Sequence, residues 1–315
     1  MKIVCLQLDP ILCEVQRNID HATKMIEGLK PEDVDILVLP EMAFTGYVFK
    51  DKGHIRPYLE DAETGPSVRW AKTQAVRLNA RVQVGYPERR VIHKDGQVHE
   101  EFYNSVCFVS PQGDLLATYA KHFLYYTDES WAEEGPGFQS IPVEGLGQVG
   151  FGICMDVNPY QFKTPFTDFE FANFHLKQGS NLVLCSMAWN KGEEEEKIQP
   201  KQKSINPLFE NEDSANNGGY SHDDDDEDWE DEEDEEQLAL ELQHKTVQYW
   251  ALRMSPFYGS HKPSKGAYIV VANRVGLESG ALFVGSSCVL KLSASGPELV
   301  GVLPSHGEGV LQVEI

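Results

Sequence analysis

Several features that define large classes of proteins are missing from this 315-residue chain. No stretch approaches the ~20 consecutive apolar residues of a transmembrane helix, so we expect no membrane association. No cluster of Lys and Arg is present of the kind that nucleic-acid binding requires, so we expect no nucleic-acid partner. Residues 1–8 begin directly with an alternating apolar segment and lack the features of a secretory signal. We therefore expect an intracellular, cytoplasmic protein, with the nucleus also open.

Paired cysteine motifs are missing as well. The six cysteines are scattered and form no Cys-x-x-Cys pair, so we expect no structural zinc site. Most of them lie within apolar runs, which favours free thiols in a reducing compartment.

Negative charge is abundant but local. The net charge is -23, and 13 of the 14 residues in 223–236 are Asp or Glu, so the rest of the chain carries only -10. Residues 191–236 as a whole are polar and poor in apolar side chains, which predicts an acidic, disordered insertion. A solvated insertion is the simpler role for this segment, and docking of a basic partner is the alternative.

The remainder of the chain alternates short apolar strands with amphipathic helices, which is an α/β pattern. Residues 103–119 read as a hairpin, so we expect mixed sheets. The same alternation resumes with a helix at 237–254. We therefore predict a single domain over 1–315, with residues 191–236 inserted into it.

The stretch from Gly150 to Tyr160 contains the most informative thiol. An apolar run ends at Cys154 and a polar, proline-bearing segment follows at once, which predicts a buried strand with a thiol at its carboxyl end. Catalytic groups of α/β sheets gather at that edge. Taken alone, Cys154 fits a packing role better, because free cysteine is among the most buried residue types.

Two charged residues occupy comparable positions. Glu41 follows the apolar run 36–39, and its apolar surroundings would raise the pKa of its carboxyl group and suit it to proton abstraction. Lys121 follows a predicted strand at 115–119 and precedes an aromatic segment, where a partly desolvated ammonium group is expected. Taken alone, each is more simply a surface charge.

Together these residues form a set that suits attack on an amide or nitrile. The thiol needs a base to take its proton, and Glu41 can serve. The attack creates a negatively charged oxygen, which Lys121 and the backbone N–H of Met155 can stabilise. No conventional Cys–His arrangement competes, because the histidines stand in no recognisable motif.

The segments around this set resemble the three signature regions of the nitrilase, or carbon–nitrogen hydrolase, superfamily. They are Pro40-Glu41, Tyr119-Ala120-Lys121 and Gly152–Asp156, and they follow the family's order. The resemblance covers nearly the whole chain apart from the acidic insertion. It implies a nitrilase-like α-β-β-α sandwich and hydrolysis of an amide through a thioester.

By this resemblance Cys154 is the nucleophile, Glu41 the general base and Lys121 the stabiliser of the tetrahedral intermediate. The chemistry needs no metal ion and no organic cofactor. Longer blocks resemble a fungal branch that converts amino-terminal Asn and Gln of proteins to Asp and Glu, releases ammonia and feeds the N-degron pathway. Two alternatives stay open: an ω-amidase or carbamoylase acting on a small free amide, and an inactive protein that binds basic partners through its acidic tract.

The family also has a second carboxylate that orients the lysine, and the sequence offers no clean match for it. Glu129 is the first choice, with Asp128, Glu133 and Glu134 as rivals. Many members carry Arg at the fifth position of Cys-x-Asp-x-Arg, where this chain has Asn158, so an Arg–Asp pair is not expected there.

Recognition of a free α-ammonium group requires a buried acceptor or carboxylate, because charge-assisted hydrogen bonds give the discrimination. Asp156 is also a candidate partner for backbone donors, and Trp189 is also a candidate core residue. The candidates for substrate binding are Asp128, Asp156, Glu170 and Trp189.

Overall fold

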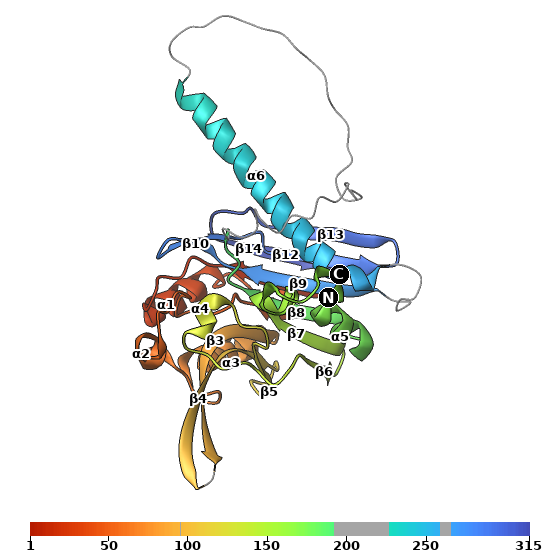
Figure 1. The fold of residues 1–315 in the computed structure, drawn as a ribbon. Helices are drawn as coiled ribbons and strands as arrows, with labels where there is room; N and C mark the ends of the chain where they lie inside the picture. Colours follow the sequence, from red (N-terminus) through yellow and green to blue (C-terminus); the bar gives the residue numbers. More distant parts are fainter. Residues whose placement is uncertain (95, 192–226, 259–265) are drawn as a thin grey trace, which may run out of the picture.

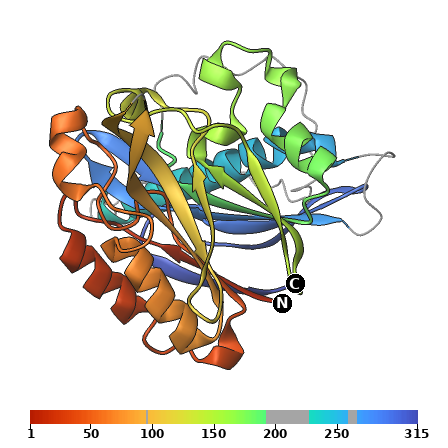
Figure 2. The ribbon, with the colours of Figure 1, turned by 90° about the horizontal axis from the view of Figure 1, so that it is seen from below.

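Two six-stranded sheets pack face to face, and helices cover both outer faces (Figures 1 and 2). The computed structural model describes residues 1–94, 96–191, 227–258 and 266–315. Both sheets contain parallel and antiparallel pairs. The predicted α-β-β-α sandwich with mixed sheets is therefore confirmed.

The first sheet has the strand order β14-β1-β2-β3-β4-β5. Its core is parallel, because β2 pairs in parallel with both β1 and β3, and β14 closes the sheet against β1. The strands are β1 (Lys2–Gln7), β2 (Ile36–Val38), β3 (Arg81–Lys94), β4 (Gln97–Val109), β5 (Leu115–Ala120) and β14 (Gly309–Glu314).

The second sheet has the order β13-β12-β9-β8-β7-β6, with β7, β8 and β9 parallel to one another. Strands β10 and β11 form a separate two-stranded antiparallel sheet. The strands are β6 (Gln139–Val143), β7 (Gly147–Ile153), β8 (Leu182–Met187), β9 (Ala267–Asn273), β10 (Val275–Glu278), β11 (Ala281–Val284), β12 (Cys288–Ser293) and β13 (Gly296–Val302).

Each sheet is covered by its own pair of longer helices. Helices α1 (Val15–Met25) and α3 (Pro66–Leu78) pack on the first sheet, and α5 (Glu170–Gln178) and α6 (Glu227–Arg253) pack on the second (Figure 2). Two four-residue helices, α2 (Lys52–Ile55) and α4 (Tyr126–Glu129), lie in the connections.

Strand β1 shows how the alternation of side chains builds two cores. Val4 and Leu6 belong to the core between the first sheet and its helices. Ile3 and Cys5 point the other way and belong to the core between the two sheets. Both faces of the strand are thus buried, which explains its nearly continuous apolar sequence.

The apolar run 81–86 predicts a strand that ends before Pro87. Strand β3 instead continues to Lys94, and with β4 it forms a two-stranded ribbon that extends beyond the body (Figure 1). Proline lacks the N–H that a strand residue donates. Pro87 tolerates this because its backbone faces away from β4: its carbonyl accepts a hydrogen bond from Glu60 N–H. The missing donor therefore takes nothing from the pairing with β4.

The helix predicted at 237–254 begins earlier than expected. Helix α6 begins at Glu227, within the acidic run, rather than at residue 237. Glu is a good helix former, and negative charge near a helix amino terminus interacts favourably with the helix dipole. Residues 192–226 lie outside the described part of the chain, so their predicted disorder stays a prediction.

Two expectations from the composition can be compared with the structure. All six cysteines are free thiols, as predicted. Within the described ranges, no helix is long and apolar enough to span a membrane.

Candidate active site

The predicted site residues come from strand ends that meet at one edge of the sandwich. Glu41 follows β2, Lys121 directly follows β5, and Cys154 directly follows β7. The two sheets are joined there by hydrogen bonds, since Ser186 Oγ donates to Leu39 O at 2.7 Å. All three side chains are 7% exposed or less. The structure thus brings the predicted set together.

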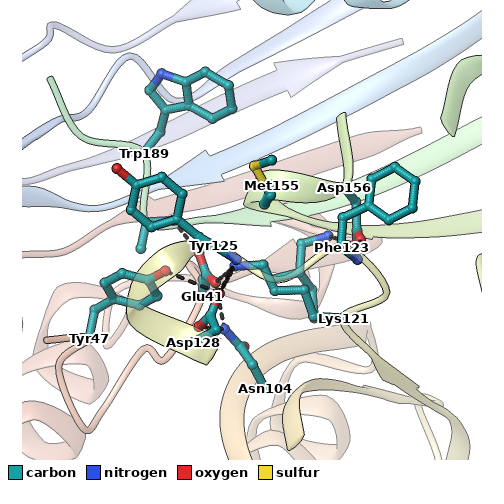
Figure 3. Close-up of polar contacts among 12 residues, drawn as sticks. Glu41, Tyr47, Asn104, Lys121, Phe123, Tyr125, Asp128, Met155, Asp156 and Trp189 are labelled. Atoms are coloured by element: carbon teal, nitrogen blue, oxygen red, sulfur yellow. Dashed lines mark hydrogen bonds and ion pairs between the residues drawn. The ribbon is translucent and has the colours of Figure 1, made fainter. Parts of the chain in front are cut away.

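Glu41 and Lys121 form a fully buried ion pair, with 2.7 Å between Lys121 Nζ and Glu41 Oε1 (Figure 3). The second oxygen of Glu41 accepts a hydrogen bond from Ala188 N–H at 2.7 Å, so the end of β8 also fixes this carboxylate. Strand β3 approaches the Glu41 backbone so closely that a Cβ on Gly85 would lie 2.6 Å from Glu41 Cα. Only glycine fits at that position.

The second carboxylate beside the lysine is Asp128, not Glu129. Asp128 is fully buried, and its Oδ2 lies 2.5 Å from Lys121 Nζ. Glu129 is exposed at the carboxyl end of α4. In a single helical turn, neighbouring residues point in different directions, and the sequence alone does not tell which one points inward. The prediction for Glu129 is therefore wrong, and its rival Asp128 occupies the position.

The charges of this cluster depend on one another. Burial alone would lower the pKa of Lys121, but the Asp128 and Glu41 carboxylates outweigh burial and raise it, so the ammonium form persists. Burial raises the pKa of Glu41; Lys121 lowers it, and Asp128 raises it further. The result is a cation that stays charged beside a carboxylate with raised basicity, as an oxyanion stabiliser and a general base require.

Cys154 begins a 3-10 turn, Cys154–Val157, and has a backbone φ of 39°. This left-handed conformation is strained for a residue with a side chain, and such strain clusters at active sites. Burial and then Glu41 raise the pKa of the thiol, whereas Lys121 and a hydrogen bond from Ala188 N–H lower it. The neutral thiol is thus the resting form, and it needs a base to react.

The sequence left two roles open for Asp156, substrate binding and bonding to backbone donors, and its contacts favour the second. Its Oδ1 accepts hydrogen bonds from the backbone N–H groups of His122 and Phe123. Its Oδ2 accepts from Tyr119 OH and Ile153 N–H. With four donors already bound, this buried carboxylate ties the residue after β5 to the turn at the nucleophile and is not available for a substrate ammonium group.

Glu170 and Trp189, the other two candidates for substrate binding, contact residues outside the cluster of Glu41, Lys121 and Asp128. Glu170 Oε1 accepts hydrogen bonds from Thr164 and from Tyr160 N–H, and its Oε2 lies 3.8 Å from Arg253 Nη2. The Trp189 ring packs against Tyr249 and Trp250 of α6. These contacts favour the packing role for Trp189, while its neighbour Ala188 takes part in the site.

The sequence did not indicate three further groups of the site. Asn104 of β4 donates to both Glu41 and Asp128, Tyr47 OH donates to Asp128 Oδ2 at 3.2 Å, and Ala188 contributes a backbone N–H. One signal was present: Asn104 and Ser105 interrupt an otherwise apolar stretch of a buried strand. No group of three or more His, Cys, Asp or Glu among the described residues is arranged to hold a metal ion.

Known proteins resemble this chain in both sequence and fold. Residues 2–160 match the family model described as carbon–nitrogen hydrolase. A protein N-terminal amidase of Schizosaccharomyces pombe is 32% identical over 100% of this chain and 99% of its own length. A second, of Saccharomyces cerevisiae, is 34% identical over 60% of this chain and 45% of its own length.

The fold comparison extends over the whole molecule. A crystal structure of an N-terminal amidase with an Asn-Glu-Ala peptide covers 100% of this chain and 98% of that chain, with a TM-score of 0.72 at 24% identity. At that identity the likeness establishes the fold, while the family model and the full-length relative establish the kinship. The chain belongs to the carbon–nitrogen hydrolase family.

Proposed function

We propose that this protein hydrolyses the side-chain amide of an amino-terminal Asn or Gln in peptides and proteins, giving Asp or Glu and ammonia. The observation that carries the proposal is the buried Glu41–Lys121 ion pair next to Cys154. It stands in a chain that is 32% identical over its full length to a protein N-terminal amidase.

The first half of the reaction acylates the enzyme. Glu41 takes the proton of Cys154 Sγ, and the thiolate forms a C–S bond to the amide carbon. The negative charge on the former carbonyl oxygen is stabilised by the Lys121 ammonium group and by Met155 N–H, at the start of the turn after the nucleophile. Glu41 then returns the proton to the amide nitrogen, the C–N bond breaks, and ammonia leaves.

The second half releases the acid. Glu41 takes a proton from a water molecule, and the resulting hydroxide attacks the thioester carbon. The C–S bond breaks, and the proton returns to the Cys154 thiolate. Lys121 stabilises this second tetrahedral intermediate as it does the first, because its charge is fixed by two carboxylates throughout.

Selection of a free amino terminus needs an acceptor that the protein itself has not already satisfied. Asp128 and Asp156 are occupied by internal donors. Glu170 keeps this role as a proposal, because its Oε2 accepts no hydrogen bond within the described ranges and lies 3.8 Å from Arg253. Substitution Glu170→Gln is expected to raise KM for a peptide without lowering kcat.

The proposed function is tested by ammonia release from two peptides that differ only in a free or an acetylated amino-terminal Asn. We expect release from the free peptide alone, with a gain of about 1 Da in the product. Release from neither peptide, together with turnover of a small free amide, would favour an ω-amidase-type enzyme. An intact fold without any turnover would favour the inactive binding protein.

The role of Cys154 as nucleophile is tested by its substitution, with the buried Cys185 as the matched control. Cys154→Ala should lower kcat by at least about 10⁴-fold, because no other group can form the thioester. Cys185→Ala removes a buried thiol of β8 and should leave kcat within about threefold, with a small loss of stability. Equal losses in the two variants would point to a folding defect rather than to loss of the nucleophile.

The remaining expectations extend this proposal. The Asp and Glu products would enter the N-degron pathway of protein degradation. The chemistry would proceed in an intracellular compartment, in keeping with six free thiols. Residues 1–315 would act as one domain, with the acidic residues 223–236 available to a basic partner.

A further inference from the structure

Asn104 lies between the two carboxylates of the cluster. It is fully buried on β4, and its side-chain NH₂ group donates to Glu41 Oε1 at 2.6 Å and to Asp128 Oδ1 at 3.0 Å (Figure 3). Its backbone carbonyl accepts a hydrogen bond from Lys121 N–H at 2.8 Å. One residue thus contacts all three charged members of the cluster.

The cluster needs a neutral donor at this position. Lys121 supplies one positive charge, while Glu41 and Asp128 together carry two negative charges, and all three side chains are fully buried. Two carboxylates that share one cation repel each other, and one of them then tends to bind a proton. An amide NH₂ group can bind an oxygen of each carboxylate at once without adding a charge.

The orientation of the amide follows from its neighbours. The reversed amide would place an oxygen against two carboxylate oxygens, which is repulsive. In the orientation present, Asn104 Oδ1 has no hydrogen-bond partner among the described residues, although the side chain is fully buried. An unpaired buried acceptor is destabilising, so packing alone does not account for an amide here.

We propose that Asn104 is a positioning residue for amide hydrolysis, which holds the Glu41 carboxylate ionised and oriented between Lys121 and Cys154. This inference rests on the proposed function only in that Glu41 is the base for Cys154. The groups that face Glu41 are Lys121, Asp128, Asn104, the Tyr47 hydroxyl group, Ala188 N–H and the thiol of Cys154.

The direction of the effect is set by the charges. The hydrogen bond from Asn104 lowers the pKa of Glu41, against the larger upward effect of burial. Removing this donor therefore raises the pKa of Glu41. The low-pH limb of kcat/KM, which reports protonation of the base in the free enzyme, then moves to higher pH.

The test is Asn104→Asp, which keeps the shape of the side chain and replaces the donor by a third carboxylate. We expect kcat/KM at pH 7 to fall by about 100-fold and the low-pH limb to rise by about one pH unit or more. An unchanged limb in the folded variant would overturn the proposal.

A second variant covers the case in which Asn104→Asp does not fold. Asn104→Ala removes both hydrogen bonds without adding charge, and we expect about a tenfold loss of kcat with a smaller upward shift of the limb. A loss of kcat without any shift would leave Asn104 a purely structural residue. The matched control is Asn18→Asp, a buried asparagine of α1 that binds Ile11 and Phe44 backbone groups, for which we expect lower stability but no shift.

A measurement that needs no substrate separates this proposal from the proposed function. Alkylation of Cys154 by iodoacetamide, followed by peptide mass spectrometry, reports removal of the thiol proton directly. In Asn104→Asp its pH dependence should move upward like that of kcat/KM. A shift in alkylation without any turnover of Asn peptides would uphold the role of Asn104 and reject the peptide substrate. Absence of a shift in alkylation, together with turnover of Asn peptides by the unsubstituted protein, would reject the role of Asn104 and uphold the peptide substrate.

Discussion

Two buried ion pairs in this protein differ in the burial of their carboxylates and in what surrounds them. In one, Lys121 is shared by two carboxylates and lies beside a thiol. In the other, Arg274 pairs with the buried Glu278 at 2.8 Å and with the half-exposed Asp9 at 3.8 Å, and its guanidinium lies 4.0 Å from the centre of the Phe283 ring. Burying charge is costly in both cases, but only around Lys121 are both carboxylates fully buried, whereas Asp9 of the second pair is open to solvent.

The Arg274–Glu278 pair instead holds backbone in place. Glu278 Oε1 accepts hydrogen bonds from Tyr47 N–H at 2.8 Å and Val48 N–H at 2.6 Å. Tyr47 in turn donates its hydroxyl group to Asp128. The Arg274–Glu278 pair therefore holds the loop of Tyr47, whose hydroxyl group contacts Asp128. The Lys121 cluster supplies the reactive groups, and the Arg274–Glu278 pair keeps their surroundings in place.

Between the two pairs, the larger effect on activity is expected from removing Asp128, one of the two carboxylates that pair with Lys121. Asp128→Asn leaves Lys121 with a single counter-charge, and we expect kcat to fall by about 10³-fold with little change in KM, because the cation is no longer held for the intermediate. Glu129→Gln, the adjacent exposed residue, is the control and should match the unsubstituted enzyme. Equal effects of the two substitutions would contradict the assignment of Asp128. Steady-state kinetics on an Asn peptide measures both.

The corresponding change in the second pair should affect folding more than chemistry. Glu278→Gln leaves the buried Arg274 with only the half-exposed Asp9 as a counter-charge, and we expect a loss of about 3 kcal/mol in the free energy of unfolding. At temperatures where the variant is folded, kcat should remain within about tenfold of the unsubstituted value. Denaturant unfolding and kinetics on the same preparation test this. A large loss of kcat with unchanged stability would show that the two pairs are not separable.

Glu60 is a third buried carboxylate to set beside the two ion pairs, because its oxygens are bound by Ser67 rather than by a cation. Glu60 accepts hydrogen bonds from Ser67 N–H and Ser67 Oγ, and burial raises its pKa to about 7 despite these bonds and nearby Arg69. A raised pKa means that the folded state holds the proton more tightly than the unfolded state. Stability from this group is complete below about pH 4.5 and is lost as pH rises through about 7.

Glu60→Gln should remove this dependence. The stability of the unsubstituted protein relative to the variant should decrease by about 3 kcal/mol between pH 4.5 and 7 and change little above that. Urea unfolding at a series of pH values measures the difference, in which the contributions of other titrating groups cancel. Parallel stability curves for the two proteins would contradict the raised pKa of Glu60.

The comparison also indicates which parts of the site a sequence can reveal. The apolar runs before them placed Cys154, Glu41 and Lys121 at strand ends, where catalytic groups gather, and the resemblance to the family's three signature regions gave them their roles. Asp128 could not be separated from Glu129, because α4 has only four residues and no periodicity to show which residue points inward. The role of Asn104 depends on distances between three elements, which a linear pattern does not contain.

The fold shows a similar division. Hydrophobic periodicity predicts a strand over residues 2–8 and a helix over residues 68–78, where β1 and α3 lie, while the two-sheet sandwich was predicted from the family resemblance. The extension of β3 through Pro87 was missed, because the cost of a proline depends on which neighbour its backbone faces. The start of α6 at Glu227 was missed because acidic composition indicates solvation but does not exclude a helix.

The central claim is that Glu41 removes the proton from Cys154, whereas Glu278 only supports the structure. The most direct test is the rate of Cys154 alkylation by iodoacetamide at pH 7 in Glu41→Gln, with Glu278→Gln as the matched control. We expect at least about a 100-fold slower reaction in Glu41→Gln, because the pKa of the thiol is raised by burial and no base remains, and nearly unchanged alkylation in the control. Equal alkylation of Glu41→Gln and the unsubstituted protein would contradict the account.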